Sequence, residues 1–372
     1  MARALLHSRK RSDPSAGYLI VLVAVSVLYI ATCAPGPVWQ DSGVIQYRVL
    51  NNDIQGRLGL ALSHPLYYSI AIIARHLPFG DPAYKVNVTT ALISAFAVAN
   101  LYLLLTLWLN SPIAALIGAL SLALSHTFWR HATIPETYNL TVALLLLELI
   151  ALLNYARSSR VVHLYLLAFV NGLAIANHML ATIPLACYLV LVAAMLLKKK
   201  IAGRQLVWMA MVWMIGAAPF EYLFVRHLLE THSISATLAS AAFGDSWRGN
   251  VLNTSMSWSI IKENFMWFAL NYPTPNVLLG IAGISYLGRV SPKPWFGRVI
   301  LALLVLFLAF AFRYTIVDRY AFFIPFYCMV SILIGVGACL FVTNVNRKGV
   351  AGMLLLFCFL TIPAYVAAPK AA

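Results

Sequence analysis

Apolar segments of about 18–24 residues recur along the whole chain, and they constrain the fold more than any other feature of the sequence. As an α-helix, each segment is long enough to cross about 30 Å of membrane hydrocarbon. Of the 372 residues, 62% are hydrophobic and 10% are charged, whereas a soluble domain is about half apolar and a quarter charged. The sequence therefore predicts an all-α polytopic membrane protein held in a lipid bilayer.

The expected spans form a single integral membrane domain, residues 1–372, because no repeat or flexible linker divides the chain. About eleven spans are predicted from hydropathy and length, at 17–34, 86–109, 113–129, 137–154, 161–179, 181–197, 205–225, 268–288, 299–312, 321–342 and 349–367. Pro273 and Pro275 interrupt the span at 268–288, since proline removes a helical hydrogen bond.

The formal net charge of +15 reports the orientation of the chain in the membrane, because the basic residues gather in alternate gaps between spans. A nucleic-acid partner is not expected. Short cytoplasmic loops of membrane proteins are enriched in Lys and Arg. This pattern predicts a cytoplasmic N-terminal tail (1–16), a long first extracytoplasmic loop (35–85) and a later extracytoplasmic loop (226–267). The expected location is the inner or plasma membrane of the cell, with several passes.

The segment 64–79 is apolar but short, and it carries Arg75 and His76. We expect a helix that lies at the membrane interface within the first outer loop. The alternative is that 64–79 crosses the membrane, which would invert the orientation of every later span. That alternative would place the basic run at 198–200 outside, against the usual charge asymmetry.

Two carboxylates in outer loops are candidate catalytic residues. Asp41 lies in QDSG, seven residues after the first span, and Gly43 beside it allows a tight turn. Glu136 follows Pro135, which can begin the next helix with Glu136 in its first turn. Each also has a structural interpretation: Asp41 could cap its own loop, and Glu136 could stabilise a helix N-terminus.

Six further polar residues on the same expected face are candidate substrate-binding groups: His64, Arg130, His178, Arg313, Asp318 and Arg319. Charges this close to hydrocarbon are costly unless they are paired or used. The structural alternative for the last two is an Arg319–Asp318 ion pair. The functional alternative is an arginine clamp on a lipid-linked phosphate, since guanidinium groups bind phosphate oxygens in pairs.

The order of these motifs resembles the GT-C class of membrane glycosyltransferases, within the branch related to protein O-mannosyltransferases. The resemblance covers roughly the first half of the chain, through QDSG (40–43), SHPLYY (63–68), LPFGDPAYKVNVTTAL (77–92), WRHATIPETYNL (129–140) and NGLAIANHM (171–179). FRYTIVDRY (312–320) is a counterpart of the late outer turn. The sequence departs from the family pattern at Val44, where an acidic residue is common, and at Leu66, where a second proline is usual.

The resemblance implies transfer of a sugar, with mannose one candidate, from a polyprenyl-phosphate donor to a protein or glycan acceptor outside the cell membrane. It implies that Asp41 and Glu136 are the acidic residues of the site. An acceptor hydroxyl needs a base within hydrogen-bond reach, which Asp41 could supply, with inversion at the sugar carbon. Arg313, Arg319, or a divalent metal ion held by Asp41 and Glu136, could stabilise the leaving phosphate. No other cofactor is expected.

Two other classes of function are compatible with so hydrophobic a chain. A transporter or flippase for lipid-linked sugars would need ionisable groups near the membrane midplane, and Glu148 is a candidate for such a group. A non-catalytic membrane scaffold would use Asp41 and Glu136 only as caps.

Overall fold

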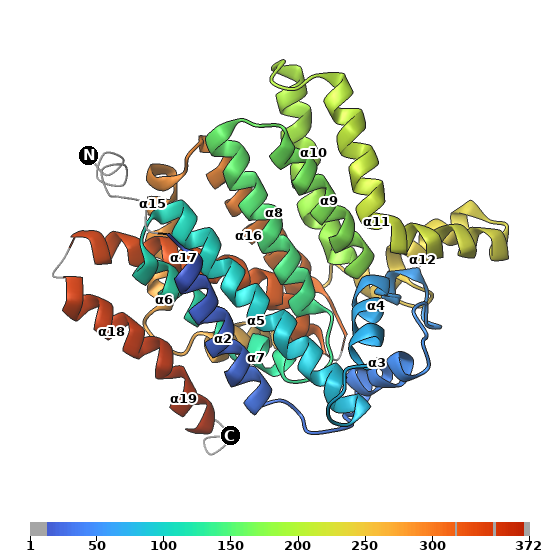
Figure 1. The fold of residues 1–372 in the computed structure, drawn as a ribbon, viewed down its shortest axis with the longest axis horizontal. Helices are drawn as coiled ribbons and strands as arrows, with labels where there is room; N and C mark the ends of the chain where they lie inside the picture. The colour runs from blue at the N-terminus through green and yellow to red at the C-terminus, as the bar shows by residue number, and fades with distance from the viewer. Residues whose placement is uncertain (1–12, 317, 345–346, 368–372) are drawn as a thin grey trace.

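The computed structural model describes residues 13–316, 318–344 and 347–367. Most of the expected N-terminal tail, residues 1–12, therefore lies outside the described residues. Within the described ranges the chain is helical and contains no strand. Figure 1 shows the long helices side by side in one bundle, with short helices gathered at one end. The main helices of the bundle are α2 (Ser15–Ala31), α5 (Pro82–Leu109), α6 (Pro112–Ala123), α7 (His126–Ala132), α8 (Tyr138–Ser158), α9 (Val162–Asn177), α10 (Thr182–Leu197), α11 (Gly203–Thr231), α15 (Val277–Val290), α16 (Pro294–Arg313), α17 (Ile324–Asn344), α18 (Arg347–Phe359) and α19 (Thr361–Ala367).

Seven helical segments in the described ranges are long and apolar enough to cross a membrane, or eight if the pair α6 and α7, bent by 71°, forms one span. The chain is therefore a multi-pass membrane protein. Each of the eleven predicted spans has a helix in its place, but α2, α9 and α15 contain only 14–17 residues. The number eleven stays a prediction.

Three segments differ locally from the expectation. The predicted span 268–288 is divided, because α14 (Trp258–Asn271) ends before Pro273 and α15 begins at Val277. Helix α11 continues to Thr231, past the predicted end at 225, so the loop 226–267 is largely helical. The segment 64–79 forms α4 (Pro65–Ala74), whose ten residues span about 15 Å and are too few to cross a bilayer.

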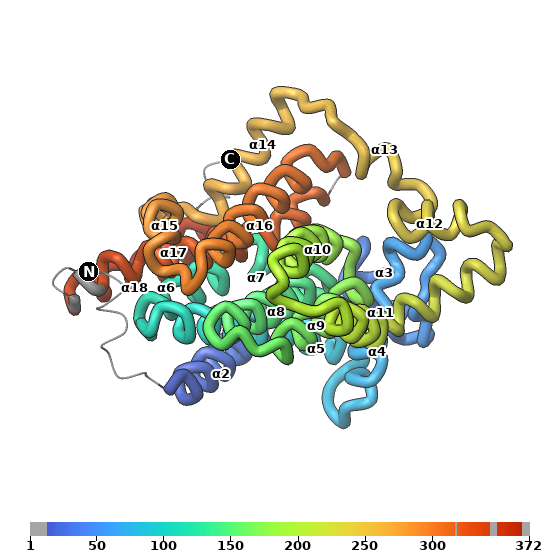
Figure 2. The backbone as a smooth tube through the Cα atoms, turned by 90° about the horizontal axis from the view of Figure 1, so that it is seen from above, coloured from blue at the N-terminus to red at the C-terminus, as the bar shows by residue number. Residues whose placement is uncertain are grey.

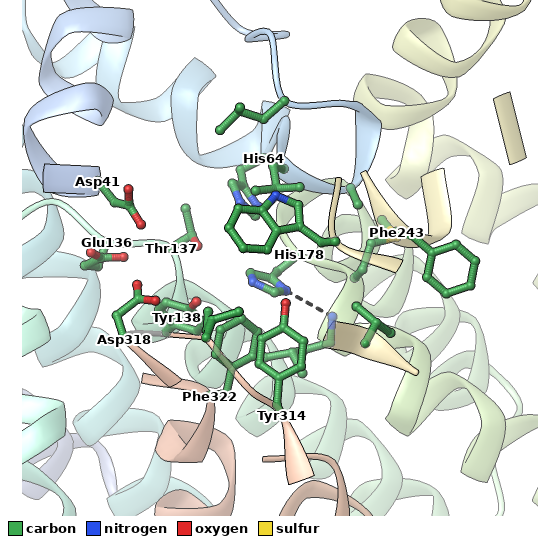
Figure 3. A pocket seen from close by; sticks show the side chains of 18 of the residues that line it. Asp41, His64, Glu136, Thr137, Tyr138, His178, Phe243, Tyr314, Asp318 and Phe322 are labelled. Atoms are coloured by element: carbon green, nitrogen blue, oxygen red, sulfur yellow. Dashed lines mark hydrogen bonds between the residues drawn. The ribbon is translucent and has the colours of Figure 1, made fainter. Parts of the chain in front are cut away.

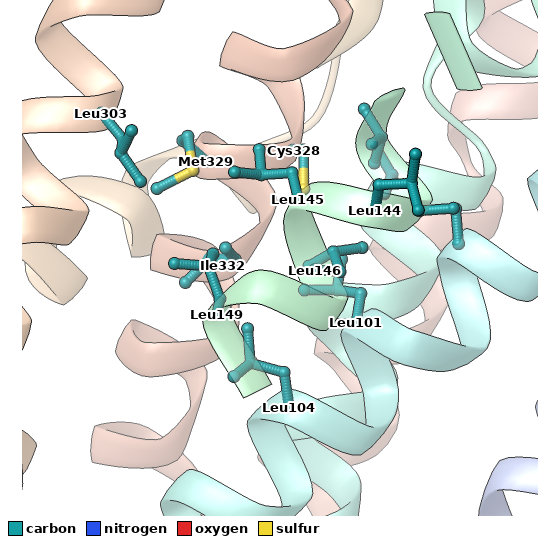
Figure 4. Packing of buried hydrophobic residues seen from close by; sticks show 14 of the residues in the cluster. Leu101, Leu104, Leu144, Leu145, Leu146, Leu149, Leu303, Cys328, Met329 and Ile332 are labelled. Carbon is teal, nitrogen blue, oxygen red and sulfur yellow. The ribbon is translucent and has the colours of Figure 1, made fainter. Parts of the chain in front are cut away.

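The interior of the bundle is built around α8 and α17, which are buried along most of their length. Figure 4 shows leucines of α5 and α8 interlocking with Leu303 of α16 and with Cys328, Met329 and Ile332 of α17. In contrast, α11 and α18 leave most of their apolar side chains exposed. These exposed faces are the surfaces that lipid would cover.

Helices α15 and α17 approach each other closely because glycines face one another. A Cβ atom added at Gly283 would lie 2.0 Å from the carbonyl oxygen of Leu333, and one added at Gly337 would lie 1.9 Å from that of Leu279. Small residues let the backbones of membrane helices come together in this way. The contact fixes the second half of the bundle.

The short helices lie together at one end of the bundle, as Figures 1 and 2 both show. They are α3 (Gln40–Leu50), η1 (Leu60–Leu62), α4, α12 (Ile234–Phe243) and α13 (Arg248–Val251), while η2 (Met179–Ala181) and η3 (Arg319–Phe323) precede α10 and α17. Helix α12 packs on η1, and α4 packs on α9 and α11. This end of the bundle carries the candidate site.

Candidate functional site

Asp41 lies in the first turn of helix α3, and not in the loop that its sequence suggested. The helix is anchored by Gln46, whose side chain accepts from the backbone N–H of Val38 (2.9 Å) and donates to Asn87 of α5 (2.7 Å). Gly43 is needed for a close approach, because an added Cβ would lie 2.4 Å from the Val38 carbonyl oxygen. The Asp41 side chain is exposed to the pocket that α3 borders.

Glu136 lies in the loop before α8, which begins at Tyr138, so the prediction that it sits in the first helical turn is wrong. The Ser42 hydroxyl donates to Glu136 Oε1 over 3.1 Å, which joins this loop to α3 beside Asp41. Burial raises the pKa of Glu136 to about 8, and the charges of Asp41 and Asp318 add to the shift. Near neutral pH the Glu136 carboxyl is thus largely protonated.

Asp318 brings a third carboxyl to the same wall from the turn between α16 and η3. Burial, followed by the charge of Asp41, raises the pKa of Asp318. Figure 3 shows Asp41, Glu136 and Asp318 together on one side of the pocket. Carboxylates crowded in this way share protons or attract a cation. Among the described residues, however, no group of three or more His, Cys, Asp or Glu is arranged to hold a metal ion.

Two histidines form the floor beside this acidic wall. His64 has a left-handed backbone conformation (φ 49°) immediately before Pro65, and its ring stacks on His178 with 4.8 Å between centroids. His178 follows α9 and is nearly buried. Burial and the charge of Arg48 lower the pKa of His64 to about 4, and burial next to His64 lowers the pKa of His178. Both rings are therefore neutral at physiological pH.

Arg48 is the cation that the sequence analysis missed. Its guanidinium lies 3.7 Å from the centre of the Tyr68 ring and donates to the carbonyl oxygens of Leu62 and Ser63. Of the described residues that line the pocket, Arg48 is the only one with a positive charge. It stands seven residues after Asp41, a spacing of two helical turns, which would have placed both on one face had 40–50 been recognised as a helix.

Three arginines that the sequence suggested as substrate-binding groups do not line the pocket in the part of the chain that the structure describes. Arg319 pairs with Glu263 and Asn264 of α14 and lies over Trp267, so the expected Arg319–Asp318 pair is replaced by one with a distant segment. Arg313 donates to the backbone carbonyl oxygens of Val251, the last residue of α13, and of Asn253. Arg130 is exposed, 5.4 Å from the Tyr320 ring centre.

The pocket has a volume of about 320 Å³ and two chemically different ends. The carboxylates lie at one end and Phe243 lies at the other, with His64 and His178 between them (Figure 3). Further apolar side chains that line the pocket come from α10, α13, α16 and the residue before α13, namely Ile183, Val251, Phe310 and Trp247. A molecule with a polar head and a hydrocarbon tail matches this division.

Part of the sequence matches one known protein family, and the fold matches solved structures of membrane proteins. Residues 63–201 match the family model described as the Protein O-mannosyl-transferase TMEM260 N-terminal domain. That match covers less than half of the chain, and it includes four of the five segments that carried the sequence resemblance, all except QDSG (40–43).

Solved structures show the same fold. ArnT from Cupriavidus metallidurans bound to undecaprenyl phosphate is similar with a TM-score of 0.65 and 14% identity, over 95% of this chain and 65% of that chain. Its apo state matches with a TM-score of 0.64 and 15% identity, over 96% and 65%. The archaeal oligosaccharyltransferase AglB from Archaeoglobus fulgidus, in complex with an inhibitory peptide and a dolichol-phosphate, matches with a TM-score of 0.56 and 14% identity, over 97% and 56%.

The chain thus spans about two thirds, or less, of the length of the proteins that it matches. At these identities the structures establish the fold alone. The resemblance to GT-C glycosyltransferases, first drawn from the sequence motifs, is confirmed by the family match and by the shared fold.

Proposed function

We propose that this protein transfers a sugar from a polyprenyl-phosphate donor to an acceptor hydroxyl, at the pocket bordered by α3, α4, α12 and the start of α8. The observation that carries the proposal is the division of one pocket into an acidic end and an apolar end. The phosphate and sugar would occupy the polar part, while the first isoprene units would lie against the apolar side chains. ArnT was solved with undecaprenyl phosphate and AglB with a dolichol-phosphate, which supports this class of donor.

Asp41 is proposed as the base, because it is the exposed one of the three carboxyls that line the pocket. It would take the proton of the acceptor hydroxyl as the hydroxyl oxygen forms a bond to the anomeric carbon. The bond between that carbon and the phosphate oxygen breaks at the same time, and the electron pair leaves with the polyprenyl phosphate. Attack opposite the leaving group inverts the configuration at the anomeric carbon.

Arg48 is proposed to stabilise the negative charge of the leaving phosphate, in place of the arginines first considered. It is the cation that lines the pocket among the described residues, and its position is fixed by Tyr68 and two carbonyl groups. A preorganised cation lowers the energy of a developing anion without reorganising at the moment of reaction. Glu136, protonated near neutral pH, can donate a hydrogen bond to the substrate.

A divalent ion at Asp41 and Glu136 also remains a proposal, and it would supply further positive charge at the phosphate. Asp41 and Glu136 would hold it once Glu136 had released its proton, which replaces the hydrogen-bonding role of the protonated carboxyl. Oxygens of the donor would have to complete the coordination, because three protein ligands do not converge in the described ranges. The sugar, with mannose favoured by the family match, and the acceptor, protein or glycan, are proposed on the same basis. We propose that the site faces the extracytoplasmic side of the cell membrane, with the N-terminus in the cytoplasm.

A transporter or flippase function is less well supported than sugar transfer, because the contacts of Glu148, the buried acid that suggested it, are structural. Glu148 accepts hydrogen bonds from Asn171 (3.0 Å) and from Tyr188 (3.0 Å), and Trp213 in turn donates to Asn171. The carboxyl thus joins α8, α9, α10 and α11 in a fully bonded network. Such a network stabilises helix packing in a membrane and leaves Glu148 no open face toward a cavity.

The decisive experiment is release of polyprenyl phosphate from a panel of purified polyprenyl-phosphate sugars, mannose included, by the wild-type protein with acceptor peptides or glycans. Asp41→Asn should lower the rate by at least about 100-fold without loss of folded protein, because a positioned base contributes a factor of that order. Glu230→Gln, an exposed carboxylate outside the pocket, is the matched control. Full activity of Asp41→Asn would eliminate Asp41 as the base, and no release from any donor would refute the proposed function.

A further inference from the structure

The ring nitrogens of His64 and His178 have their hydrogen-bonding roles fixed by backbone partners. His64 Nδ1 lies 2.7 Å from the carbonyl oxygen of Asn177. A carbonyl oxygen only accepts, so Nδ1 of His64 carries a proton. The backbone N–H of Leu180 donates to Nδ1 of His178 over 3.0 Å, so this nitrogen carries a lone pair. The two rings are held in opposite tautomers.

The remaining nitrogens therefore differ in what they offer to a ligand. In a neutral imidazole one nitrogen donates and the other accepts. His64 thus has a lone pair at Nε2, whereas His178 has an N–H at Nε2. Both rings line the pocket, and Figure 3 shows them between the carboxylates and Phe243.

Neighbouring contacts hold this pair in place. The Asn177 amide donates to the Thr137 carbonyl (3.0 Å) and to the Thr141 hydroxyl (2.9 Å), which positions the carbonyl that His64 uses. Aromatic rings flank His178, with Tyr138 at 5.2 Å between centroids. Rotation of either ring would break its hydrogen bond to the backbone, which is costly for groups that are largely buried.

We propose that His178 donates from Nε2 to a non-bridging oxygen of the donor phosphate, and that His64 accepts at Nε2 from a hydroxyl of the transferred sugar. This inference rests on the proposed function and specifies how its donor is recognised. The assignment cannot be exchanged between the two rings. A phosphate oxygen without a proton can bond only to the ring that offers an N–H, and a lone pair facing it would repel it.

A neutral donor suits this position because the neighbouring wall is acidic. A protonated histidine here would be drawn toward Asp41 and Asp318, and it would lose the bond that Leu180 donates to His178. The neutral His178 ring can donate its N–H to the phosphate without being drawn toward these carboxylates. The sugar is then distinguished by its hydroxyl, since a buried acceptor left without a donor costs binding energy.

Substitution of a histidine by Asn or by Gln tests the roles of its two ring nitrogens separately. The amide N of Asn occupies about the place of the His Nδ1, and that of Gln occupies about the place of Nε2. His178→Gln keeps a donor toward the pocket, while His178→Asn removes it. His64→Asn keeps a donor for the Asn177 carbonyl and tolerates the left-handed backbone, but it lacks the acceptor at Nε2.

The first probe is undecaprenyl phosphate without a sugar, with binding measured by titration in detergent. We expect His178→Asn to weaken binding about tenfold or more, since a hydrogen bond to a charged group contributes about 1.5–3 kcal/mol. His178→Gln should weaken it less than about threefold, and His64→Asn should leave it unchanged. Glu230→Gln serves as the control, and melting temperatures verify that each variant is folded.

The second probe is polyprenyl-phosphate mannose, for which His64→Asn should weaken binding by about fivefold, the size of a neutral hydrogen bond. Nitrogen-15 spectra of histidine-labelled protein should show the proton on Nδ1 of His64 and on Nε2 of His178. Wild-type binding by His178→Asn, weaker binding of the sugar-free phosphate by His64→Asn, or the opposite protonation would overturn the inference while the proposed function stands. Failure of the wild-type protein to bind any lipid phosphate would refute both.

Discussion

The protonation of Glu136 predicts an unusual pH dependence of stability. Its pKa is about 8 in the folded protein and 4.5 in an unfolded chain. Between these values the folded state holds a proton that the unfolded state has released, so raising the pH favours unfolding. The slope is at most about 1.4 kcal/mol per pH unit, and it disappears above pH 8 because both states are then ionised. The contribution of Glu136 to the free energy of unfolding is fully present below pH 4.5, where both states are protonated.

The test compares the wild-type protein with Glu136→Gln, which cannot ionise. In detergent with a chelator present, the melting temperature of the wild type should fall between pH 5 and 8 by about 2–3 °C per pH unit more than that of the variant. Titrating groups that do not interact with Glu136 contribute equally to both proteins and cancel in the difference. Glu230→Gln, whose carboxylate is exposed, should keep the wild-type slope. Equal slopes for the wild type and Glu136→Gln would refute the argument that the site holds Glu136 protonated.

Three further substitutions test other parts of the structure. Arg48→Lys should weaken binding of undecaprenyl phosphate by about tenfold in titrations, because a point charge cannot bond to two carbonyls and stack on a ring as the guanidinium does; unchanged affinity would remove Arg48 from the phosphate site. Arg319→Ala should lower the unfolding free energy by about 2 kcal/mol, because the buried side-chain oxygen of Asn264 loses its donor, while affinity for the same lipid should stay unchanged; a selective loss of affinity would restore Arg319 as a phosphate ligand. Gly283→Ala should cost about 2 kcal/mol or more in thermal unfolding, whereas Gly280→Ala on the same helix, with 3.7 Å of space, should cost little; equal effects would contradict the close contact of α15 with α17.

The positions of the membrane segments could be predicted because hydrophobic length is a local property of the chain. Each predicted span contains a helix, and the break expected from Pro273 and Pro275 occurs between α14 and α15. The short helices were harder to predict. Residues 40–50 have a mixed polar pattern typical of a loop, and they become a helix through contacts with the start of α5, such as the bond from Gln46 to Asn87. Tertiary contacts of this kind are not visible in local sequence.

The candidate site was predictable in part, for the same reason. Asp41 and Glu136 were selected as unusual carboxylates in adjacent outer loops, and the structure brings both to one pocket with His64 and His178. Their roles stay predictions. Arg130 was chosen for its nearness in sequence to Glu136, and Arg313 and Arg319 for their place in a short outer turn. The fold, however, determines the partners of these charges.

The clearest case is Arg319, whose partner Glu263 lies in α14, 56 positions away. Arg48 was missed because its spacing of seven residues from Asp41 places both side chains on one face only if the segment is a helix.

The three acids of the pocket come from widely separated parts of the chain, at positions 41, 136 and 318. During synthesis the first two can meet once α8 has been inserted, but Asp318 arrives only after α16. A partly made polypeptide therefore has an incomplete acidic wall and lacks the ring of Phe322 and the other late side chains that close the cavity. For the proposed transfer, we therefore expect a chain released before α16 to leave the donor lipid intact, so that activity would report finished assembly.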